Sequence, residues 1–428
     1  MDTKKIALVW FKTNLRLRDN ECLVRAIAEN DFIVPFYCLD DLLFATTSFG
    51  FKKTEDFRLK FLRESLRQLE NELRNLGSGL VLLNGNPEQE IFKLAEDYDA
   101  HRIYAEKERA PEELNTQQKV AAELLKLNCT FLTSECRNLL DTADLPFPIT
   151  NLPEVFTEFR KRTERTVAIR PVLPIPVFIA SPGLPPINLA LLPDQVIADP
   201  RAVLQYQGGM LAAHDRLRHY FYDTQALSSY KVTRNGMVGE KYSSKFSAWL
   251  ALGCISAREI YHAIKAYETN HGANESTYWL FFELLWRDYF GFCMEKNGSQ
   301  YFLRAGNQQL KAVDPNKFNS ALNKWVNGQT GVKFIDANMI ELKLTGFMSN
   351  RGRQNVASYF CNDLKLDWRY GAAYFEQQLI DYDVCNNWGN WAYLAGVGHG
   401  PKANRYFNIA KQAATYDPNN LFQNLWLT

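Results

Sequence analysis

The chain has 428 residues, 46% of them hydrophobic and 23% charged, so it is long and apolar enough to form two or three domains. No apolar run approaches the roughly 20 residues that a membrane-spanning helix needs, which excludes a membrane protein. The eight cysteines stand singly without a CxxC pair, which argues against a disulfide framework and a structural zinc site. The N-terminus lacks the pattern of a cleavable secretory signal. We therefore expect a cytoplasmic protein without a bound metal.

The net charge of +1 hides an asymmetry between the two halves of the chain. Residues 1–200 hold 25 Lys and Arg against 30 Asp and Glu, a net charge of −5, whereas residues 201–428 hold 24 against 18, a net charge of +6. Eight of the nine tryptophans also follow position 200. We expect an anionic partner, and the chemistry, to lie in the second half.

Short apolar runs alternate with amphipathic stretches over the first 130 residues. The pattern predicts strands at 6–11, 32–39, 80–83, 102–105 and 130–132, and helices at 56–76, 88–95 and 112–127. Strands and helices that alternate in this way form a parallel sheet covered on both faces, which is a Rossmann-like α/β domain. Such a sheet offers a ligand crevice at its strand ends.

Eleven of the seventeen prolines fall between Pro146 and Pro200. Proline removes backbone donors and favours extended neighbours, so we interpret 131–205 as a linker packed across the domains. After it the pattern becomes helical, and 206–428 is predicted to be a mostly α-helical domain. Its clearest helices are at 210–222, 247–266, 278–295, 318–325, 336–345 and 350–363.

Hydroxyl side chains precede the apolar run at 248–252, in the order Tyr242-Ser243-Ser244-Lys245-Phe246-Ser247. The pattern is typical of an ordinary helix cap. It equally suits a helix N-terminus whose N–H groups and hydroxyls bind an anion such as a diphosphate. Short motifs match by chance, so this motif alone leaves both interpretations open.

The segment 283–289 places Glu283, Trp286 and Arg287 on one predicted helix. Glu283 and Arg287 are four residues apart and could simply form an ion pair on the helix surface. Trp286 lies between them, and a stacking surface beside a carboxylate and a guanidinium is suited to a flipped nucleobase. The segment therefore predicts either a surface pair or a nucleobase site.

Two arginines, Arg351 and Arg353, flank a glycine at the start of the predicted helix at 350–363. A solvated helix end is one explanation. Cations in the first turn oppose the helix dipole, however, so we favour an anionic partner, either a phosphate or a buried carboxylate.

The segment 379–391 is the densest in chemistry, with Asp381, Asp383, Asn387 and two tryptophans within a few residues. Tryptophans in such a segment are more often core residues than cofactor contacts. Asp and Asn side chains are costly to bury without partners, so we expect a polar ligand there. The six histidines show no metal-ligand spacing, which argues against a metal.

Together these segments resemble the photolyase/cryptochrome flavoprotein family over almost the whole chain. Residues 9–20 (VWFKTNLRLRDN) are similar to the family's first strand and loop. The segments 230–237, 242–247, 345–358 and 381–391 are most similar to the DASH cryptochrome branch. The resemblance implies that 1–130 is an antenna-binding domain, that 131–205 is the interdomain linker and that 206–428 binds FAD.

The resemblance also implies the residues that hold a U-shaped FAD. Arg353 and Asp381 match an ion pair beside the isoalloxazine ring, and Asp383 matches a contact on the adenosine side. Asn387 matches the residue that faces flavin N5, where an amide oxygen can accept a hydrogen bond and favour reduced flavin. The implied FAD contacts are Tyr230, Ser243, Ser244, Lys245, Phe246, Ser247, Arg287, Asn350, Arg353, Asp381, Asp383 and Asn387.

For DNA, the resemblance implies a lesion pocket that contains Glu283 and Trp286. The implied DNA contacts are Arg234, Trp286, Asn350 and Arg351. In the first domain, Glu108 matches the glutamate that binds a 5,10-methenyltetrahydrofolate antenna in the DASH branch. The alternative for Glu108 is a solvated position in the charge run 106–109.

The sequence departs from the wider family on the lesion side. Gln354 and Tyr393 stand where many cyclobutane-dimer photolyases have methionine and a second tryptophan. Both changes are usual in the DASH branch, and they weigh against efficient repair of duplex lesions. The chain also ends at Thr428, short of the tail that the family usually carries.

The family reduces its flavin through three tryptophans. Trp391 and Trp368 match the inner and middle members of that chain. The outer position falls at Asp314-Pro315, so we expect the terminal electron donor to be absent.

Two functions follow from the resemblance, and both need the same FAD cavity. The first is a monomeric DASH-type photolyase that repairs cyclobutane pyrimidine dimers, mainly in single-stranded DNA, by light-driven electron transfer from reduced FAD. The second is a blue-light photoreceptor that passes a redox or conformational change to a partner. A (6-4) photolyase is a weaker alternative, because such an enzyme needs histidines beside the lesion and none occurs between His271 and His399.

Overall fold

The computed structural model describes residues 4–304, 315–399 and 405–428. The chain begins with a sheet of five parallel strands in the order β3-β2-β1-β4-β5. The strands are β1 (Ile6–Phe11), β2 (Phe32–Leu39), β3 (Val81–Asn84), β4 (Arg102–Glu106) and β5 (Thr130–Ser134). The predicted α/β fold class is confirmed, and β5 continues past the predicted boundary at residue 130.

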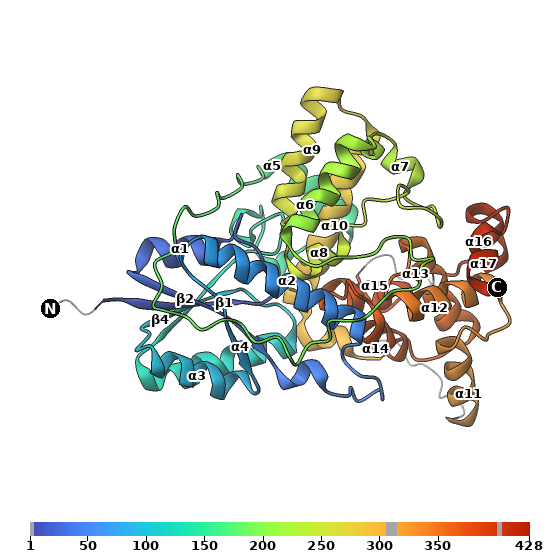
Figure 1. Cartoon of the computed structure of the whole chain (residues 1–428). Coiled ribbons are helices and arrows are strands. Elements are labelled where there is room, and N and C mark those ends of the chain that lie inside the picture. The colour runs from blue at the N-terminus through green and yellow to red at the C-terminus, as the bar shows by residue number, and fades with distance from the viewer. Residues whose placement is uncertain (1–3, 305–314, 400–404) are drawn as a thin grey trace.

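Four helices cover the two faces of this sheet (Figure 1). They are α1 (Glu21–Glu29), α2 (Asp56–Asn75), α3 (Pro87–Asp97) and α4 (Pro111–Leu124). Side chains of β1 alternate between the faces: Val9 and Phe11 enter the core that contains α1 and α2, whereas Leu8 and Trp10 enter the core beneath α3 and α4. The sequence pattern missed α1, which begins where the side chain of Asn20 accepts a hydrogen bond from Leu23 N.

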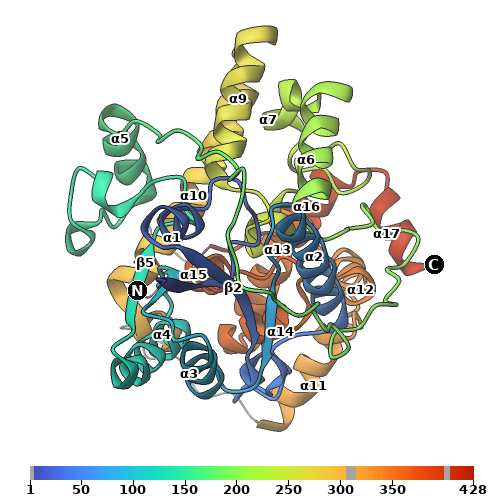
Figure 2. The same ribbon diagram turned by 60° about the vertical axis from the view of Figure 1, so that its left-hand side comes forward.

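The proline-rich segment 131–205 begins within β5 and carries one α-helix, α5 (Phe156–Thr166), and two short 3-10 helices at Thr142–Asp144 and Ile149–Asn151. The rest of it has no regular secondary structure. Its backbone bonds to three separated parts of the fold. Ile33 N donates to Ala180 O at 2.8 Å, Ile179 N donates to Leu76 O at 2.8 Å, and Asp199 N donates to Leu344 O at 3.2 Å. The segment therefore ties the sheet, α2 and the helical part together, and Figure 2 shows it crossing between them.

The rest of the chain is helical. Its helices are α6 (Met210–Arg218), α7 (Tyr230–Thr233), α8 (Ser247–Leu252), α9 (Ala257–His271), α10 (Glu275–Asn297), α11 (Pro315–Val326), α12 (Lys333–Thr345), α13 (Asn350–Ser358), α14 (Trp368–Gln378), α15 (Val384–Leu394), α16 (Ile409–Tyr416) and α17 (Leu421–Leu427). The predicted helices at 210–222 and 350–363 each end in a π turn, at His219–Asp223 and Tyr359–Asp363. None of the described helices combines the length and the apolarity that crossing a bilayer requires.

The single helix predicted at 247–266 is wrong, because the structure divides it into α8 and α9 at Gly253. Gly253 has φ +68°, and a Cβ there would lie 1.9 Å from Thr13 O. The two parts of the chain meet at this point: Leu15 N donates to Leu252 O at 3.1 Å, and the buried Arg16 donates to Gly253 O at 3.0 Å. The break is therefore imposed by a contact between distant segments.

Replacement of Gly253 tests this junction. Gly253→Ala should lower the free energy of unfolding through both the positive φ and the clash with Thr13. Gly396→Ala is the control, because Gly396 also ends a helix at positive φ (+75°), with a closing bond from Val397 N to Ala392 O like that from Cys254 N to Trp249 O, but has no atom within 4 Å of its Cβ position. We expect Gly253→Ala to cost about 1–3 kcal/mol more than the control in urea unfolding. Equal losses would contradict the role of the contact.

Candidate functional site

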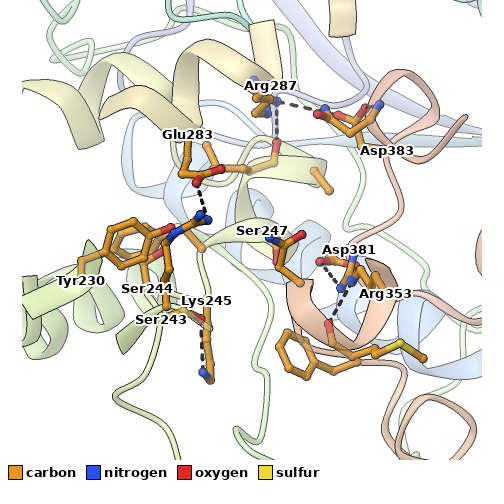
Figure 3. A pocket seen from close by; sticks show the side chains of 18 residues that line it. Tyr230, Ser243, Ser244, Lys245, Ser247, Glu283, Arg287, Arg353, Asp381 and Asp383 are labelled. Atoms are coloured by element: carbon orange, nitrogen blue, oxygen red, sulfur yellow. Dashed lines mark hydrogen bonds and ion pairs between the residues drawn. The ribbon is translucent and has the colours of Figure 1, made fainter. Parts of the chain in front are cut away.

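Two adjoining cavities lie between the helices of the second part of the chain. They measure about 270 and 110 Å³ and share the lining residues Asn350, Arg353, Asp381, Asp383 and Asn386. Figure 3 shows how side chains from α7, the loop before α8, α10, α13 and the loop before α15 converge on the larger one. Every side chain predicted to contact FAD lines one of the two cavities.

The hydroxyl-rich loop before α8 lines the larger cavity. Residue Phe246 occupies the N-cap of α8 and its side chain makes no capping bond, so the interpretation as an ordinary helix cap is wrong. Ser243, Ser244 and Ser247 line the cavity instead. Their hydroxyls and the neighbouring lysine are a donor set that fits a diphosphate.

Lys245 is the buried cation of this loop, 3% exposed with φ +59°. Its Nζ lies 3.4 Å from Ser243 Oγ and 3.2 Å from the centre of the Tyr242 ring. Burial lowers the pKa of Lys245 well below its usual value, and the charge of Arg216 adds to the effect. A bound anion would restore that pKa, so the site is matched to negative charge.

Arg353 and Asp381 form an ion pair at the border between the two cavities. Arg353 Nη2 lies 2.8 Å from Asp381 Oδ2 and 3.0 Å from Oδ1, and Arg353 Nε donates to Met348 O at 2.8 Å. Arg353 lies in the first turn of α13, which is capped by Ser349. Of the two predicted partners for this cation, the structure therefore contains the buried carboxylate.

Asp383 is a buried carboxylate between two guanidinium groups. It forms an ion pair with Arg137, lies 4.0 Å from Arg287 Nη2, and caps α15 by accepting from Asn386 N at 2.9 Å. Burial alone would raise the pKa of Asp383, but the charges of Arg137 and Arg287 outweigh it and lower the pKa to about 2. Asp383 is therefore a fixed negative charge.

Sequence reasoning missed Arg137 because it treated 131–205 as a linker. Arg137 lies in the loop just after β5, and carboxyl ends of parallel strands are where ligand crevices form. Its position at the end of a predicted strand is the sequence feature that could have identified it as a site residue. The structure also adds Asn386, which lines both cavities, and Trp279, whose Nε1 donates to Glu283 at 3.1 Å.

Glu283 and Arg287 do not act as a surface pair, so that interpretation is wrong. Glu283 Oε1 instead accepts from Arg234 Nη1 at 2.6 Å, while Arg287 donates to Arg137 O at 2.7 Å and Leu250 O at 3.1 Å. Burial raises the pKa of Glu283, and the charge of Arg234 opposes this effect. Both Glu283 and Arg234 line the larger cavity.

Asn387 and Trp391 line the smaller cavity. Asn387 Nδ2 donates to Ala372 O at 2.9 Å, which leaves its Oδ1 to accept from a ligand. The Trp391 ring contacts the rings of Trp325, Phe360 and Phe375, at centroid distances of 6.2, 5.7 and 5.1 Å. Trp368 is buried and its ring contacts that of Trp388 at 5.8 Å.

Two predicted DNA contacts do not line these cavities. The ring of Trp286 stacks on Phe156 of α5 at 3.8 Å and meets Tyr393 edge-on at 5.8 Å. Arg351 Nη2 donates to Asn235 Oδ1 at 3.0 Å, and its guanidinium lies 4.4 Å from the centre of the Tyr416 ring. Both side chains are half-buried.

A further cavity of about 210 Å³ lies between the sheet and the helical part, and Glu108 lines it. Glu108 is buried and its Oε1 lies 2.5 Å from Lys12 Nζ, so the interpretation as a solvated charge is wrong. Burial raises the pKa of the neighbouring Glu113 to about 7, with the charge of Glu108 contributing. Arg137, Ala251 and Asp383 also line this cavity, and the latter two line the larger cavity as well.

Within the described residues, no cluster of three or more His, Cys, Asp or Glu side chains could hold a metal ion. The polar groups of the two adjoining cavities are instead hydroxyls, amides and paired charges. They fit an extended organic anion with hydrogen-bonding ring atoms.

Comparison with known proteins identifies the class to which this fold and site belong. Residues 7–179 match the family described as DNA photolyase, and residues 279–428 match the FAD binding domain of DNA photolyase. The chain is 46% identical to the cryptochrome DASH of Gloeobacter violaceus over all of its length and 86% of that protein. It is 43% identical to the cryptochrome DASH of Danio rerio, which it covers to 84%.

Solved structures agree. The crystal structure of the Synechocystis sp. cryptochrome superposes with a TM-score of 0.94 at 45% identity, covering all of this chain and 89% of that one. A bacterial class III photolyase from Agrobacterium tumefaciens shares the fold, with a TM-score of 0.85 at 24% identity and cover of 100% and 87%. The chain belongs to the photolyase/cryptochrome family, in its cryptochrome DASH branch. It is thus a photolyase-type protein with an FAD-binding domain.

The ion cluster at Asp383 predicts how stability and FAD content depend on charge. Because its folded pKa of about 2 lies below the usual 3.8, Asp383 stabilises the fold above pH 3.8, and this contribution is lost as the pH falls towards 2. Asp383→Asn should therefore flatten the acid limb of the stability curve. It should also cost about 2–5 kcal/mol at pH 7 and release much of the FAD, since two buried cations lose their partner.

The control is Asp215→Asn, which removes an exposed carboxylate 3.0 Å from Arg218 and should change stability by less than about 1 kcal/mol. Urea unfolding between about pH 2 and pH 7, with the flavin absorbance of each purified variant, makes the comparison. Full FAD occupancy and an unchanged pH profile in Asp383→Asn would overturn the assignment.

Proposed function

We propose that this protein is a light-dependent photolyase of the DASH type that repairs cyclobutane pyrimidine dimers, mainly in single-stranded DNA. The observation that carries the proposal is that Glu283 and Arg234 line the same cavity as the predicted FAD contacts. FAD, when bound in reduced form, supplies the electron that splits the dimer under light. The protein binds and orients both molecules.

The cofactor half of the site has a division of roles. Ser243, Ser244, Lys245 and Ser247 bind the diphosphate, because they present hydroxyls and a desolvated cation to the cavity. The Arg353–Asp381 pair holds the polar edge of the flavin ring. Asn387 Oδ1 accepts a hydrogen bond from an N–H of the ring, since its Nδ2 is already bonded to Ala372 O.

The lesion half recognises bases and backbone separately. Glu283 accepts hydrogen bonds from the N–H groups of the dimer, while Arg234 and Arg351 contact phosphates. Gln354 lines the smaller cavity, and Tyr393 lies against Trp286. An amide and a tyrosine replace apolar surface at these positions, which supports a preference for lesions that need not be flipped out of a duplex.

A repair assay tests the proposal. Under blue light, the reduced holoprotein should remove dimers from a single-stranded oligonucleotide and act much more slowly on the same dimer in a duplex. Glu283→Ala should reduce the preference in darkness for the dimer-containing strand over the undamaged strand by roughly tenfold or more, since a hydrogen bond to a charged group contributes about 1.5–3 kcal/mol. The proposal would be refuted if dimers were lost as fast in darkness as under light, or if no dimers were lost under light.

One observation favours the second candidate, a blue-light photoreceptor without significant repair. Phe156 covers one face of Trp286 at 3.8 Å, so the predicted stacking surface is already engaged. A holoprotein that leaves dimers intact but shows a reversible light-induced change in its flavin spectrum would support the photoreceptor instead.

We further propose that the cavity at Glu108 holds an antenna chromophore, with 5,10-methenyltetrahydrofolate as the ligand. A pterin presents N–H groups that a buried carboxylate accepts, and Glu108 is buried beside the cavity. The archaeal photolyase from Sulfolobus tokodaii, which matches the fold with a TM-score of 0.79 at 24% identity, is described with two FAD molecules. A second flavin is therefore the competing ligand.

Removal of the Glu108 carboxylate distinguishes three cases: a bound folate, a second bound FAD and a cavity without a chromophore. Glu108→Gln, purified with folate supplied, should lose a near-ultraviolet absorber and keep its FAD. Glu123→Gln is the control, since it removes an exposed carboxylate from an i,i+3 pair with Lys126 in the same domain. Two FAD per chain would replace the folate assignment, and an unchanged spectrum would contradict the role of Glu108.

The route of photoreduction gives another prediction. The predicted gap at Asp314-Pro315 lies outside the residues whose side chains the structure describes. Trp325, which contacts Trp391, is 0% exposed and so cannot itself meet an external reductant. We expect photoreduction with a thiol donor to be slower than in a protein with all three tryptophans, and Trp391→Phe to abolish it. Fast reduction that survives Trp325→Phe would show a different route.

A further inference from the structure

Glu283 and Arg234 are bound to each other in the structure, although the proposed function gives each a different DNA partner. Arg234 follows α7 and Glu283 lies on α10, and Arg234 Nη1 is 2.6 Å from Glu283 Oε1. Figure 3 shows Glu283 at the wall of the larger cavity, and Arg234 lines the same cavity. The Arg234 guanidinium and the Glu283 carboxylate are therefore bonded to each other, and neither is free to bind DNA.

The surroundings hold this pair closed. Trp279 Nε1 donates to the same Glu283 oxygen at 3.1 Å, and the Arg234 guanidinium lies 5.3 Å from the centre of the Trp279 ring. The Arg234 and Glu283 side chains are only 21% and 28% exposed. A partly buried pair of this kind resists opening, because water cannot fully solvate either charge once its partner is lost.

We propose that the Arg234–Glu283 pair is a latch that only a damaged strand opens at low cost, a role that rests on the proposed function. A phosphate replaces Glu283 as the partner of Arg234, and pyrimidine N–H groups replace Arg234 as donors to Glu283. Undamaged DNA supplies the phosphate, but its pyrimidines, which carry the same N–H groups, are not linked into a dimer that presents those groups together to Glu283. The latch therefore lowers affinity for undamaged strands and makes Arg234 a specificity determinant.

The chain contains a matched pair for comparison. Lys231 Nζ lies 2.9 Å from Glu275 Oε2, and this pair joins α7, which Arg234 directly follows, to α10. Its side chains are 35% and 82% exposed, so water already competes for both charges. Glu275→Gln thus removes the same charge as Glu283→Gln from the same helix without opening the latch.

Binding measured in darkness tests the latch. We compare the holoprotein with its Glu283→Gln, Glu275→Gln, Arg234→Gln and Arg234→Gln/Glu283→Gln variants on a single-stranded oligonucleotide with and without one dimer. FAD absorbance confirms that each variant is folded. Glu283→Gln should bind the undamaged strand roughly three- to tenfold more tightly than Glu275→Gln does, with a salt slope steeper by about 0.7, as expected for one added phosphate contact on a single strand. The double variant should lose this gain.

Arg234→Gln provides a second arm. A simple phosphate-binding arginine would weaken both strands equally when removed. The latch instead predicts a larger loss for the dimer-containing strand, because Arg234 contacts phosphate fully only when the dimer occupies Glu283.

These measurements distinguish failure of the latch from failure of the proposed function. Glu283→Gln that binds undamaged DNA no better than Glu275→Gln, or a gain that persists in the double variant, overturns the latch while repair by the parent stands. A parent that neither binds nor repairs the dimer overturns the proposed function and the latch together.

Discussion

The site depends on the buried charge of Asp383. This carboxylate is held by Arg137 after β5 and Arg287 on α10, and it caps α15 through Asn386 N. A charge that is removed from water costs several kcal/mol unless it is paired, so the meeting of the three segments at this point stabilises the fold. The cluster joins α10 to the start of α15 beside the larger cavity, which Asp383 and Arg287 both line.

The same ion cluster places the two proposed chromophore sites beside each other. Asp383 and Ala251 line both the FAD cavity and the cavity at Glu108. The hydrophobic core supports this arrangement, because residues on one face of the sheet and residues of the helical part belong to one continuous core. The α/β part and the helical part therefore act as one body around two neighbouring cavities.

Local sequence patterns predicted the secondary structure correctly where the residues of one segment determine its conformation. The apolar runs at 6–11 and 32–39 match β1 and β2 residue for residue, because strands buried on both faces are continuous apolar runs. The pattern failed at Gly253, where Thr13 forces a break, and at 106–109, where three of four charged residues are buried by elements distant in sequence. Burial of a charge run depends on what covers it.

The residue types and order of the chain were sufficient for the parallel sheet, the helical second part and the family. The side chains that the resemblance implies for FAD all line one of the two adjoining cavities. Partner choice required the tertiary structure. Glu283 could pair with Arg287 on its own helix, yet it pairs with Arg234, and Arg137 had no visible role until the end of β5 met α15. Hydrogen bonds and ion pairs act over a few ångströms between segments far apart in the chain, and only folding sets those distances.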